Sequence, residues 1–320
     1  MGGLHGCSKG SRSGALLASP AACGPLSPSG GLSCLQVKLV KKKGREVSGI
    51  ENLPGIDPSK AHVARMYDYY LGGDNNFEAD RIACMELDKV VPGTRGLAIN
   101  NRNYLVRVVR TLATEYGVRQ FIDIGTGLPT QNNVHQVAGR AHPDARVIYV
   151  DIDPIVSVHG RALIAHDNST AFILEDVRRT AEILSHPDTQ RLIDFSQPVA
   201  ALYISFLHQI PDRDDPAGLV SAMMNELAPG SFVAMSHLVS PDPQLRKQLT
   251  DLMLNATEGN WGRVRTRTEV DRFFAGLEIL PPGLVEITTW RPDSTAAEEQ
   301  TFNWIEYGGV ARKPGEPSSG

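Results

Sequence analysis

The sequence has no long hydrophobic run and very little cysteine. No window approaches 18 consecutive apolar residues, so we predict no transmembrane helix. Four cysteines occur in 320 residues, and none belongs to a Cys-x-x-Cys pair. This pattern predicts neither a disulfide framework nor a zinc site, and it fits a reducing cytoplasm. The sequence also lacks a Ser-His-Asp set, a metal-ligand cluster and a Walker-type phosphate loop.

A strong net charge is missing as well, since the formal net charge at pH 7 is −4. That total gives no hint of nucleic-acid binding, but it hides two unlike segments. Residues 1–50 carry seven basic residues against one acid, whereas the remaining residues carry 25 against 35. Residues 1–36 contain eight Gly, three Pro and seven Ser, a composition that cannot bury enough apolar surface to fold. We therefore predict a disordered, basic leader over 1–52, a folded domain over 53–314 and a tail over 315–320.

The predicted leader has three features that could carry a function. The apolar run 15–22 is short and interrupted by Pro20, so we disfavour an export signal. Gly2 begins a myristoylation-like sequence, but Gly6 stands where Ser or Thr is needed. The basic run 38–45 could contact nucleic acid or anionic lipid, although we favour a solvated tail.

The folded domain begins with helices and continues as alternating strands and helices. Asp57 and Pro58 predict the start of a helix that Gly72-Gly73 ends, and further helices are expected near 78–90 and 97–116. This order predicts an α/β fold with a doubly wound, mostly parallel sheet of seven strands and an antiparallel edge strand. The predicted strands are 119–124, 146–151, 170–174, 199–205, 231–236 and a late hairpin of 284–290 and 302–310.

A glycine turn follows the first predicted strand. Gly125 and Gly127 allow a ligand to approach the backbone closely, in front of a helix expected from about Gln131. Asp123 stands at the strand end, where an acid suits a ligand with a positive amino group. A dinucleotide-binding fold would want Gly or Ala at the position of Thr130 and usually lacks such an acid.

Acidic residues also end the next two predicted strands. Asp151 lies 24 residues after the second glycine, where a carboxylate meets ribose hydroxyls in this architecture. We interpret the neighbouring Asp153 as a helix cap. Asp176 could accept from the exocyclic amine of adenine while the Val177 N–H donates to a ring nitrogen; alone, it would be read as a helix cap. The three successive strand ends together indicate a ligand site.

This series resembles that of class I S-adenosylmethionine-dependent methyltransferases. Segments 207–212, 227–232 and 273–284 are similar to later parts of that superfamily. More narrowly, the chain resembles a bacterial family whose members are thought to be S-adenosyl methyltransferases. This family was long known only as a domain of unknown function. The resemblance covers about residues 53–314. One departure is Asp74-Asn75, where we expect Lys and then an acid, which puts a substrate role for that loop in doubt. The narrower blocks are 55–59, 64–73, 76–81 and 307–313.

The resemblance implies that S-adenosylmethionine is the cofactor. Its amino-acid end is expected over the glycine turn near Asp123, its ribose at Asp151 and its adenine at Asp176. The residues implied in cofactor binding are Asp123, Gly125, Thr126, Gly127, Asp151, Ile152, Asp176 and Val177.

In this superfamily an amino-terminal helix commonly covers the cofactor pocket. Tyr67 and Tyr70 are spaced i, i+3 on one helix face, so they could cover the sulfonium by cation–π contact. Plain core packing is an equal alternative for both. Gly72 and Asn76 are further candidates for the lid or the substrate site.

The implied reaction is an in-line displacement from a sulfonium, so it needs no strong acid. Positioning alone can supply about 7–11 kcal/mol of barrier reduction when the geometry is favourable. His208, just beyond the fourth strand, is a weak candidate for a base or a substrate-orienting group, and a structural histidine is the interpretation that we favour.

The methyl acceptor cannot be identified from the sequence. We expect a small molecule rather than nucleic acid or membrane, because the acidic body lacks a clustered basic face. One alternative is a regulatory protein that binds S-adenosylmethionine without catalysis. A second is an NAD-dependent oxidoreductase, against which Thr130 and Asp123 argue.

Overall fold

The structure, a computed structural model, describes residues 57–130, 132–164, 167–294, 298 and 303–315. The predicted leader therefore lies outside the described residues, as does most of the predicted tail. No helix within these ranges combines the length and apolar character needed to cross a bilayer.

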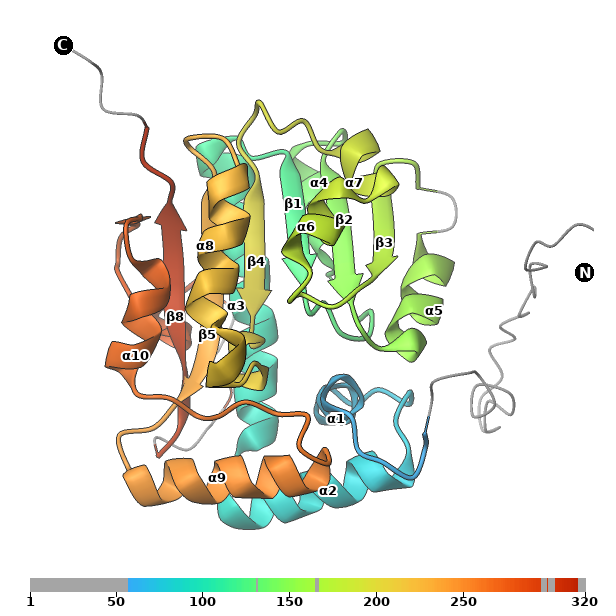
Figure 1. The fold of residues 1–320 in the computed structure, drawn as a ribbon, viewed down its shortest axis with the longest axis vertical. Coiled ribbons are helices and arrows are strands. Elements are labelled where there is room, and N and C mark those ends of the chain that lie inside the picture. Colours follow the sequence, from blue (N-terminus) through green and yellow to red (C-terminus); the bar gives the residue numbers. More distant parts are fainter. Residues whose placement is uncertain (1–56, 131, 165–166, 295–297, 299–302, 316–320) are drawn as a thin grey trace, which may run out of the picture. The chain divides into compact units, whose positions relative to one another are not determined.

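An eight-stranded sheet forms the centre of the domain (Figure 1). The order is β3-β2-β1-β4-β5-β8-β6, with β1 to β5 parallel and β8 antiparallel to β5. This confirms the predicted α/β fold. The antiparallel strand β8 was predicted at the edge of the sheet, but it lies one position inside. β6 and β7 pair with it on the side away from β5. The strands are β1 (Gln120–Ile124), β2 (Arg146–Asp151), β3 (Thr170–Leu174), β4 (Ala200–Ile204), β5 (Phe232–Val239), β6 (Glu278–Ile279), β7 (Val285–Glu286) and β8 (Ile305–Arg312).

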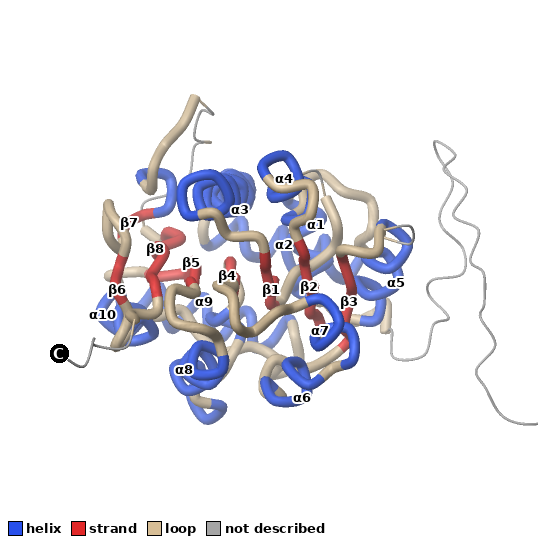
Figure 2. The backbone as a smooth tube through the Cα atoms, turned by 90° about the horizontal axis from the view of Figure 1, so that it is seen from above, coloured by secondary structure: helices blue, strands red, loops and turns tan. Residues whose placement is uncertain are grey.

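Helices cover both faces of this sheet (Figure 2). Side chains alternate along a strand, so Phe121 packs with α3, α4 and α5, whereas Ile122 packs with α6, α7 and α8. Burial on both faces explains why the strands are apolar almost throughout. The helices are α1 (Val63–Tyr70), α2 (Glu78–Val90), α3 (Thr94–Tyr116), α4 (Val134–Ala141), α5 (Pro154–Leu163), α6 (Thr180–Ser185), α7 (Pro187–Leu192), α8 (Pro216–Glu226), α9 (Pro243–Ala256) and α10 (Arg267–Asp271).

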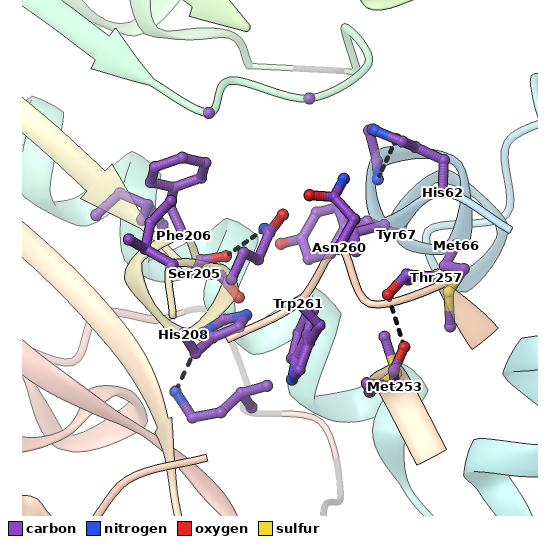
Figure 3. A pocket seen from close by; sticks show the side chains of 18 of the residues that line it. His62, Met66, Tyr67, Ser205, Phe206, His208, Met253, Thr257, Asn260 and Trp261 are labelled. Carbon is purple, nitrogen blue, oxygen red and sulfur yellow. Dashed lines mark hydrogen bonds between the residues drawn. The ribbon is translucent and has the colours of Figure 1, made fainter. Parts of the chain in front are cut away.

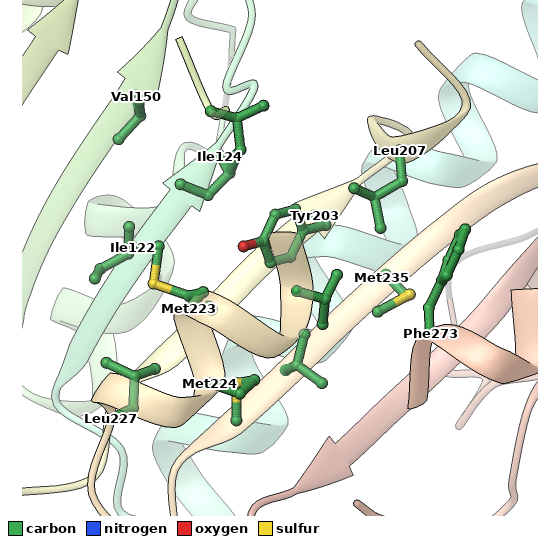
Figure 4. Packing of buried hydrophobic residues seen from close by; sticks show 14 of the residues in the cluster. Ile122, Ile124, Val150, Tyr203, Leu207, Met223, Met224, Leu227, Met235 and Phe273 are labelled. Carbon is green, nitrogen blue, oxygen red and sulfur yellow. The ribbon is translucent and has the colours of Figure 1, made fainter. Parts of the chain in front are cut away.

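The packing of α8 shows how the strands are held. Met223, Met224 and Leu227 lie over the sheet beside Ile122 and Tyr203, and all five are buried (Figure 4). Full burial of one such aliphatic side chain contributes about 1.5–3 kcal/mol. This core fixes the positions of the strand ends, which carry the candidate site.

A separate layer of helices lies at the carboxyl ends of the parallel strands. The arrows of β1 to β4 point toward α1 in Figure 1, and α1, α2 and α9 share a third apolar cluster. Asp80 of α2 joins the two amino-terminal helices, because it accepts from the backbone N–H of His62 (2.8 Å) and pairs with Arg65 (3.2 Å). These contacts confirm an N-terminal helical layer of the kind expected for a lid.

Two predicted elements differ most from the structure, and α3 also begins at Thr94 rather than at 97. The first helix begins at Val63 rather than near Asp57. Asp57 does accept from the N–H of Ser59 (3.0 Å), but the chain forms only a turn there, and His62 caps the helix by accepting from the N–H of Ala64 (3.3 Å). The predicted strand 284–290 contains only the two residues of β7. There the chain turns to bury Ile287 and Trp290 against α3, where Arg107 donates to both carbonyl oxygens.

Candidate functional site

A cavity of about 220 Å³ lies at the carboxyl ends of β1 to β4. Across the cavity from these strand ends, the wall is formed by α1, by α3 and by the segment that follows α9 (Figure 3). All eight residues proposed to bind a cofactor line this one cavity, as do Tyr67, Tyr70 and His208. The fold therefore brings together residues that are spread over more than 140 positions of sequence.

The glycine turn has the backbone that only glycine adopts readily. Gly125 and Gly127 have φ angles of +68° and +65°, in the left-handed region. A Cβ on Gly125 would lie 2.0 Å from the Phe206 ring, so this position also needs the absence of a side chain. The following helix, α4, begins at Val134, later than expected, and Gln131 lies outside the described residues.

Asp123 is a buried carboxylate at the end of β1. Its Oδ2 accepts from the Thr126 hydroxyl (2.9 Å). Burial raises the pKa of Asp123 to about 6, although the Thr126 hydroxyl and the charge of Arg102 act to lower it, while Asp151 acts to raise it. A cation placed beside this carboxylate would therefore stabilise its ionised form and lower its pKa.

Asp151 links the ends of β1 and β2. Its carboxylate accepts from the backbone N–H groups of Gly127 (2.8 Å) and Asp153 (2.9 Å). Burial raises the pKa of Asp151, while these two hydrogen bonds act to lower it. The carboxylate thus holds the glycine turn in place besides lining the cavity.

Asp153 caps α5, as predicted, by accepting from the N–H of Ile155 (2.8 Å). Its second oxygen lies 3.0 Å from His62 Nδ1, at the start of α1. Burial acts to raise the pKa of Asp153, yet the adjacent His62 ring holds it below its usual value. This contact ties the amino-terminal helix to the end of β2.

Asp176 lies at the outer end of the cavity. It forms an ion pair with Arg178, and Arg178 also contacts Asp214 (3.1 Å). Burial acts to raise the pKa of Asp176, but the bonds from Arg178 lower it overall. Ile152 lines the same region with 51% of its surface exposed, an unusual exposure for a large apolar side chain.

The lid candidates divide into two groups. Tyr67 and Tyr70 line the cavity, but their hydroxyls are engaged, with Ala98 O (2.9 Å) and Cys84 O (3.0 Å) respectively. Gly72 and Asn76 are not among the residues that line it. Gly72 ends α1 with a φ of +79°, and Asn76 donates to Asp68 (2.9 Å), so both shape the loop between α1 and α2.

His208 lines the cavity but is poorly suited to act as a base. Burial and the Arg265 charge lower its pKa to about 3, far from the neutral range in which a general base works best. Its ring packs against His237 and Trp261, at centroid distances of 5.4 and 5.0 Å. Its Nδ1 accepts from the N–H of Leu238 (3.4 Å), and a structural role stays the interpretation that we favour.

The sequence reasoning missed a polar cluster where β4 ends. The Ser205 hydroxyl donates to Glu306 of β8, and the Ser205 N–H donates to the Ser236 hydroxyl (2.8 Å). Ser236 in turn donates to Asn101 (2.6 Å), whose amide donates to the Tyr67 hydroxyl (3.0 Å). Burial raises the pKa of Glu306 to about 7, although the nearby Ser205 and Ser236 hydroxyls act to lower it.

Two sequence signals could have indicated this cluster. Ser205 ends an apolar strand run, just as the aspartates end theirs. Glu306 is an acid inside the apolar run of a buried strand, where an ionisable group needs a partner. Within the described ranges, no group of three His, Cys, Asp or Glu side chains could hold a metal ion.

Comparisons with known proteins match the whole described domain. The sequence profile of the S-adenosyl methyltransferase family matches residues 51–314. A search of the curated proteins finds no match.

Two solved structures are similar over most of this chain. One is a candidate methyltransferase from Thermobifida fusca YX, 42% identical, with a TM-score of 0.75 and coverage of 83% of this chain and 99% of that chain. The other is a DUF574 family protein from Streptomyces avermitilis MA-4680, 36% identical, with a TM-score of 0.74 and coverage of 81% and 99%.

Proposed function

The chain belongs to the S-adenosyl methyltransferase family, as its motifs indicated, and we propose that it methylates a small molecule at the cavity described above. The observation that carries this proposal is the convergence of Asp123, Asp151 and Asp176 on one cavity, beside a glycine turn in the left-handed conformation. The family does not support the alternative of an NAD-dependent oxidoreductase.

The residues present fit S-adenosylmethionine. The Asp123 carboxylate suits the ammonium group, because a buried carboxylate with a raised pKa gains most from an added cation. The open backbone at Gly127, where a Cβ would meet nothing within 4 Å, leaves room for the amino-acid end. Asp151 would accept from the ribose hydroxyls, and adenine would cover the exposed face of Ile152 near Asp176 and Val177.

The bound cofactor supplies an electrophilic methyl group on a sulfonium. The task of the protein is then to position an acceptor in line and to exclude water, which can lower the barrier by about 7–11 kcal/mol. The Tyr67 ring lies on the lid side of the cavity, where it would face the sulfonium charge. Its engaged hydroxyl fixes the ring, which favours contact through the aromatic face.

The lining of the inner cavity supports a small acceptor. Met66 of the lid, Met253 of α9 and the rings of Trp261 and Trp304 form an apolar wall around the polar cluster at Ser205. Such a wall suits a molecule that is largely apolar or aromatic, with few polar groups to orient it. Three arginines are among the described lining residues, Arg102, Arg178 and Arg213, and Arg178 is paired with Asp176 and Asp214.

Calorimetric titration with S-adenosylmethionine, S-adenosylhomocysteine and NAD tests the binding half of this proposal. We expect both adenosyl ligands to bind and NAD not to bind. Transfer of a tritiated methyl group into the small-molecule fraction of a bacterial extract tests the catalytic half, with the protein fraction as the comparison. Binding without label in either fraction would instead favour a regulatory protein, and label confined to protein would refute the small acceptor.

A further inference from the structure

We propose that Ser205 and Glu306 form a relay that removes a proton from the methyl acceptor, whose reacting atom is therefore a hydroxyl, amine or thiol. This inference rests on the proposed function, and it names residues that the family resemblance did not point to. Ser205 and Glu306 both line the cavity, and the Ser205 hydroxyl already donates to Glu306, so we assign Ser205 as the catalytic residue that contacts the acceptor, with Glu306 acting through it.

Ser205 is held in an uncommon conformation at the end of β4. Its φ angle is +52°, in the left-handed region that non-glycine residues seldom adopt. The conformation is fixed by bonds from its N–H to the Ser236 hydroxyl (2.8 Å) and to Ser236 O (3.2 Å). Figure 3 shows Ser205 between Phe206 and His208 on the wall that faces Asn260 and Tyr67. Backbone strain of this kind is retained where the surroundings enforce it, often at active sites.

Glu306 lies directly behind this serine, on β8. Its side chain has no exposed surface, Oε1 accepts from the Ser205 hydroxyl, and Oε2 has no hydrogen-bond partner of good geometry within the described residues, although the Ser236 hydroxyl lies near enough to lower the pKa of the carboxyl. A buried carboxylate with an unpaired oxygen is costly, so a purely structural role leaves this arrangement unexplained.

Among the described residues, no cation is found among the groups that act on Glu306. The ionisable and polar groups that act on it are Ser205 of β4, Ser236 of β5, Tyr67 of α1, Tyr104 of α3 and Glu286 of β7. None of these can carry a positive charge, and burial leaves the carboxyl with a pKa of about 7. A group with that pKa can both take up and give back a proton under neutral conditions.

The step balances without any further reactant. The acceptor atom forms a bond to the methyl carbon while the carbon–sulfur bond breaks and its electron pair stays on sulfur. The acceptor proton passes to Ser205 Oγ, and the hydroxyl proton of Ser205 passes to Glu306 Oε1. The products are the methylated acceptor, S-adenosylhomocysteine and a neutral Glu306 carboxylic acid, which later returns its proton to water.

Three proteins test this relay: Glu306→Gln, Ser205→Ala and the control Glu278→Gln, an isosteric change at an exposed position of β6. Calorimetry should give the same S-adenosylmethionine affinity for all three and the wild type, within about threefold. With the tritiated-methyl assay on the small-molecule fraction, Glu306→Gln should slow transfer by about 10²–10⁴-fold and Ser205→Ala by at least about tenfold. The control should be unaffected.

Two pH measurements separate the relay from a structural role. The wild-type transfer rate should fall as the pH drops below 7, because the relay requires ionised Glu306. The rate of Glu306→Gln should not show this acidic decrease. Independently of any substrate, the melting temperature of the wild type should fall relative to Glu306→Gln as pH rises from 5 to 8. The sign follows from a folded-state pKa above the unfolded value, since folding then favours the protonated form.

Each opposite result has a definite meaning. Wild-type protein that transfers label, with both variants as fast, overturns the relay and leaves the proposed function intact. A pH-independent stability difference between wild type and Glu306→Gln overturns the relay without reference to any substrate. Wild-type protein that transfers no label removes the premise and the relay with it. If Glu306→Gln does not fold, Ser205→Ala, which deletes one oxygen, decides the kinetic question.

Discussion

Binding of S-adenosylmethionine should depend on pH through Asp123. The free carboxyl has a pKa of about 6 because it is buried, and ionised Asp123 is the form that attracts the ligand ammonium. An opposite charge at contact distance lowers a carboxyl pKa by about 1–3 units, so the pKa in the complex should lie at or below about 5. Binding therefore expels a proton whenever Asp123 is protonated beforehand, and affinity should rise with pH.

The size of the effect follows from this shift. With a free pKa of about 6, roughly 90% of Asp123 is ionised at pH 7 and roughly 10% at pH 5. Affinity should therefore fall about five- to tenfold between pH 7 and pH 5. The ligand amino group stays protonated in this range, since an α-amino group titrates near 8, and contributes no slope of its own.

Calorimetry in two buffers of different ionisation enthalpy measures both quantities. We expect release of about half a proton per ligand at pH 6. Asp123→Asn should bind more weakly at pH 7 and show little dependence on pH. The groups that act on Asp123 are Thr126, Arg102, Asp151 and Tyr149, so only Asp151 could add a slope in this window. A wild-type affinity that is flat from pH 5 to 7, or an equal slope in Asp123→Asn, would refute the assignment of Asp123 to the ammonium.

Three sets of substitutions test other parts of the site. Asp151→Ala should weaken S-adenosylmethionine binding by more than about tenfold in calorimetry, because each lost charge-assisted bond is worth roughly 1.5–3 kcal/mol; a smaller loss contradicts the ribose assignment. Gly127→Ala should lower the unfolding free energy by about 1–2 kcal/mol, the cost of a left-handed alanine, and Gly125→Ala by more, because its Cβ also meets Phe206. Denaturant titration checks this order, and equal losses contradict it. Tyr67→Leu should reduce the preference for S-adenosylmethionine over uncharged S-adenosylhomocysteine, whereas Tyr67→Phe should keep it, because a cation–π contact needs only the ring.

The regular parts of the fold could be predicted because local pattern and tertiary structure agree there. The strand β2, which ends at Asp151, has the expected boundaries, and Asp153 caps the next helix, α5, as expected. In both cases a polar residue directly follows or precedes the apolar run, so the local sequence marks the boundary. The first helix was misplaced because a bond from the Ser59 N–H to Asp57 forms in an isolated turn as well as at the start of a helix, and sequence alone does not distinguish the two. The strand 284–290 failed because its residues bury against α3, a contact between distant segments.

The candidate site shows the same division. Asp123 and Asp176 were found because parallel strands bring their carboxyl ends to one edge, a rule that needs only the strand order. Glu306 was missed because β8 is antiparallel, so its beginning, not its end, reaches the cavity. Its place opposite Leu238 depends on the pairing of β5 with β8, and its pKa depends on burial that no local motif encodes.

The two shifted carboxyls of the cavity should be separable in the kinetics. Burial raises the pKa of both, to about 6 for Asp123 and about 7 for Glu306, but only Asp123 is expected to meet a cation when S-adenosylmethionine binds. Since kcat/KM reports the free protein and kcat the complex, kcat/KM for S-adenosylmethionine should show two ionisations, near pH 6 and near pH 7, and kcat only the one near pH 7. Asp123→Asn should remove the lower ionisation from kcat/KM, and Glu306→Gln should remove the one that remains in kcat. If both profiles kept the same two ionisations, the cation would not be reaching Asp123, and the two carboxyls would share one role rather than dividing binding from proton removal.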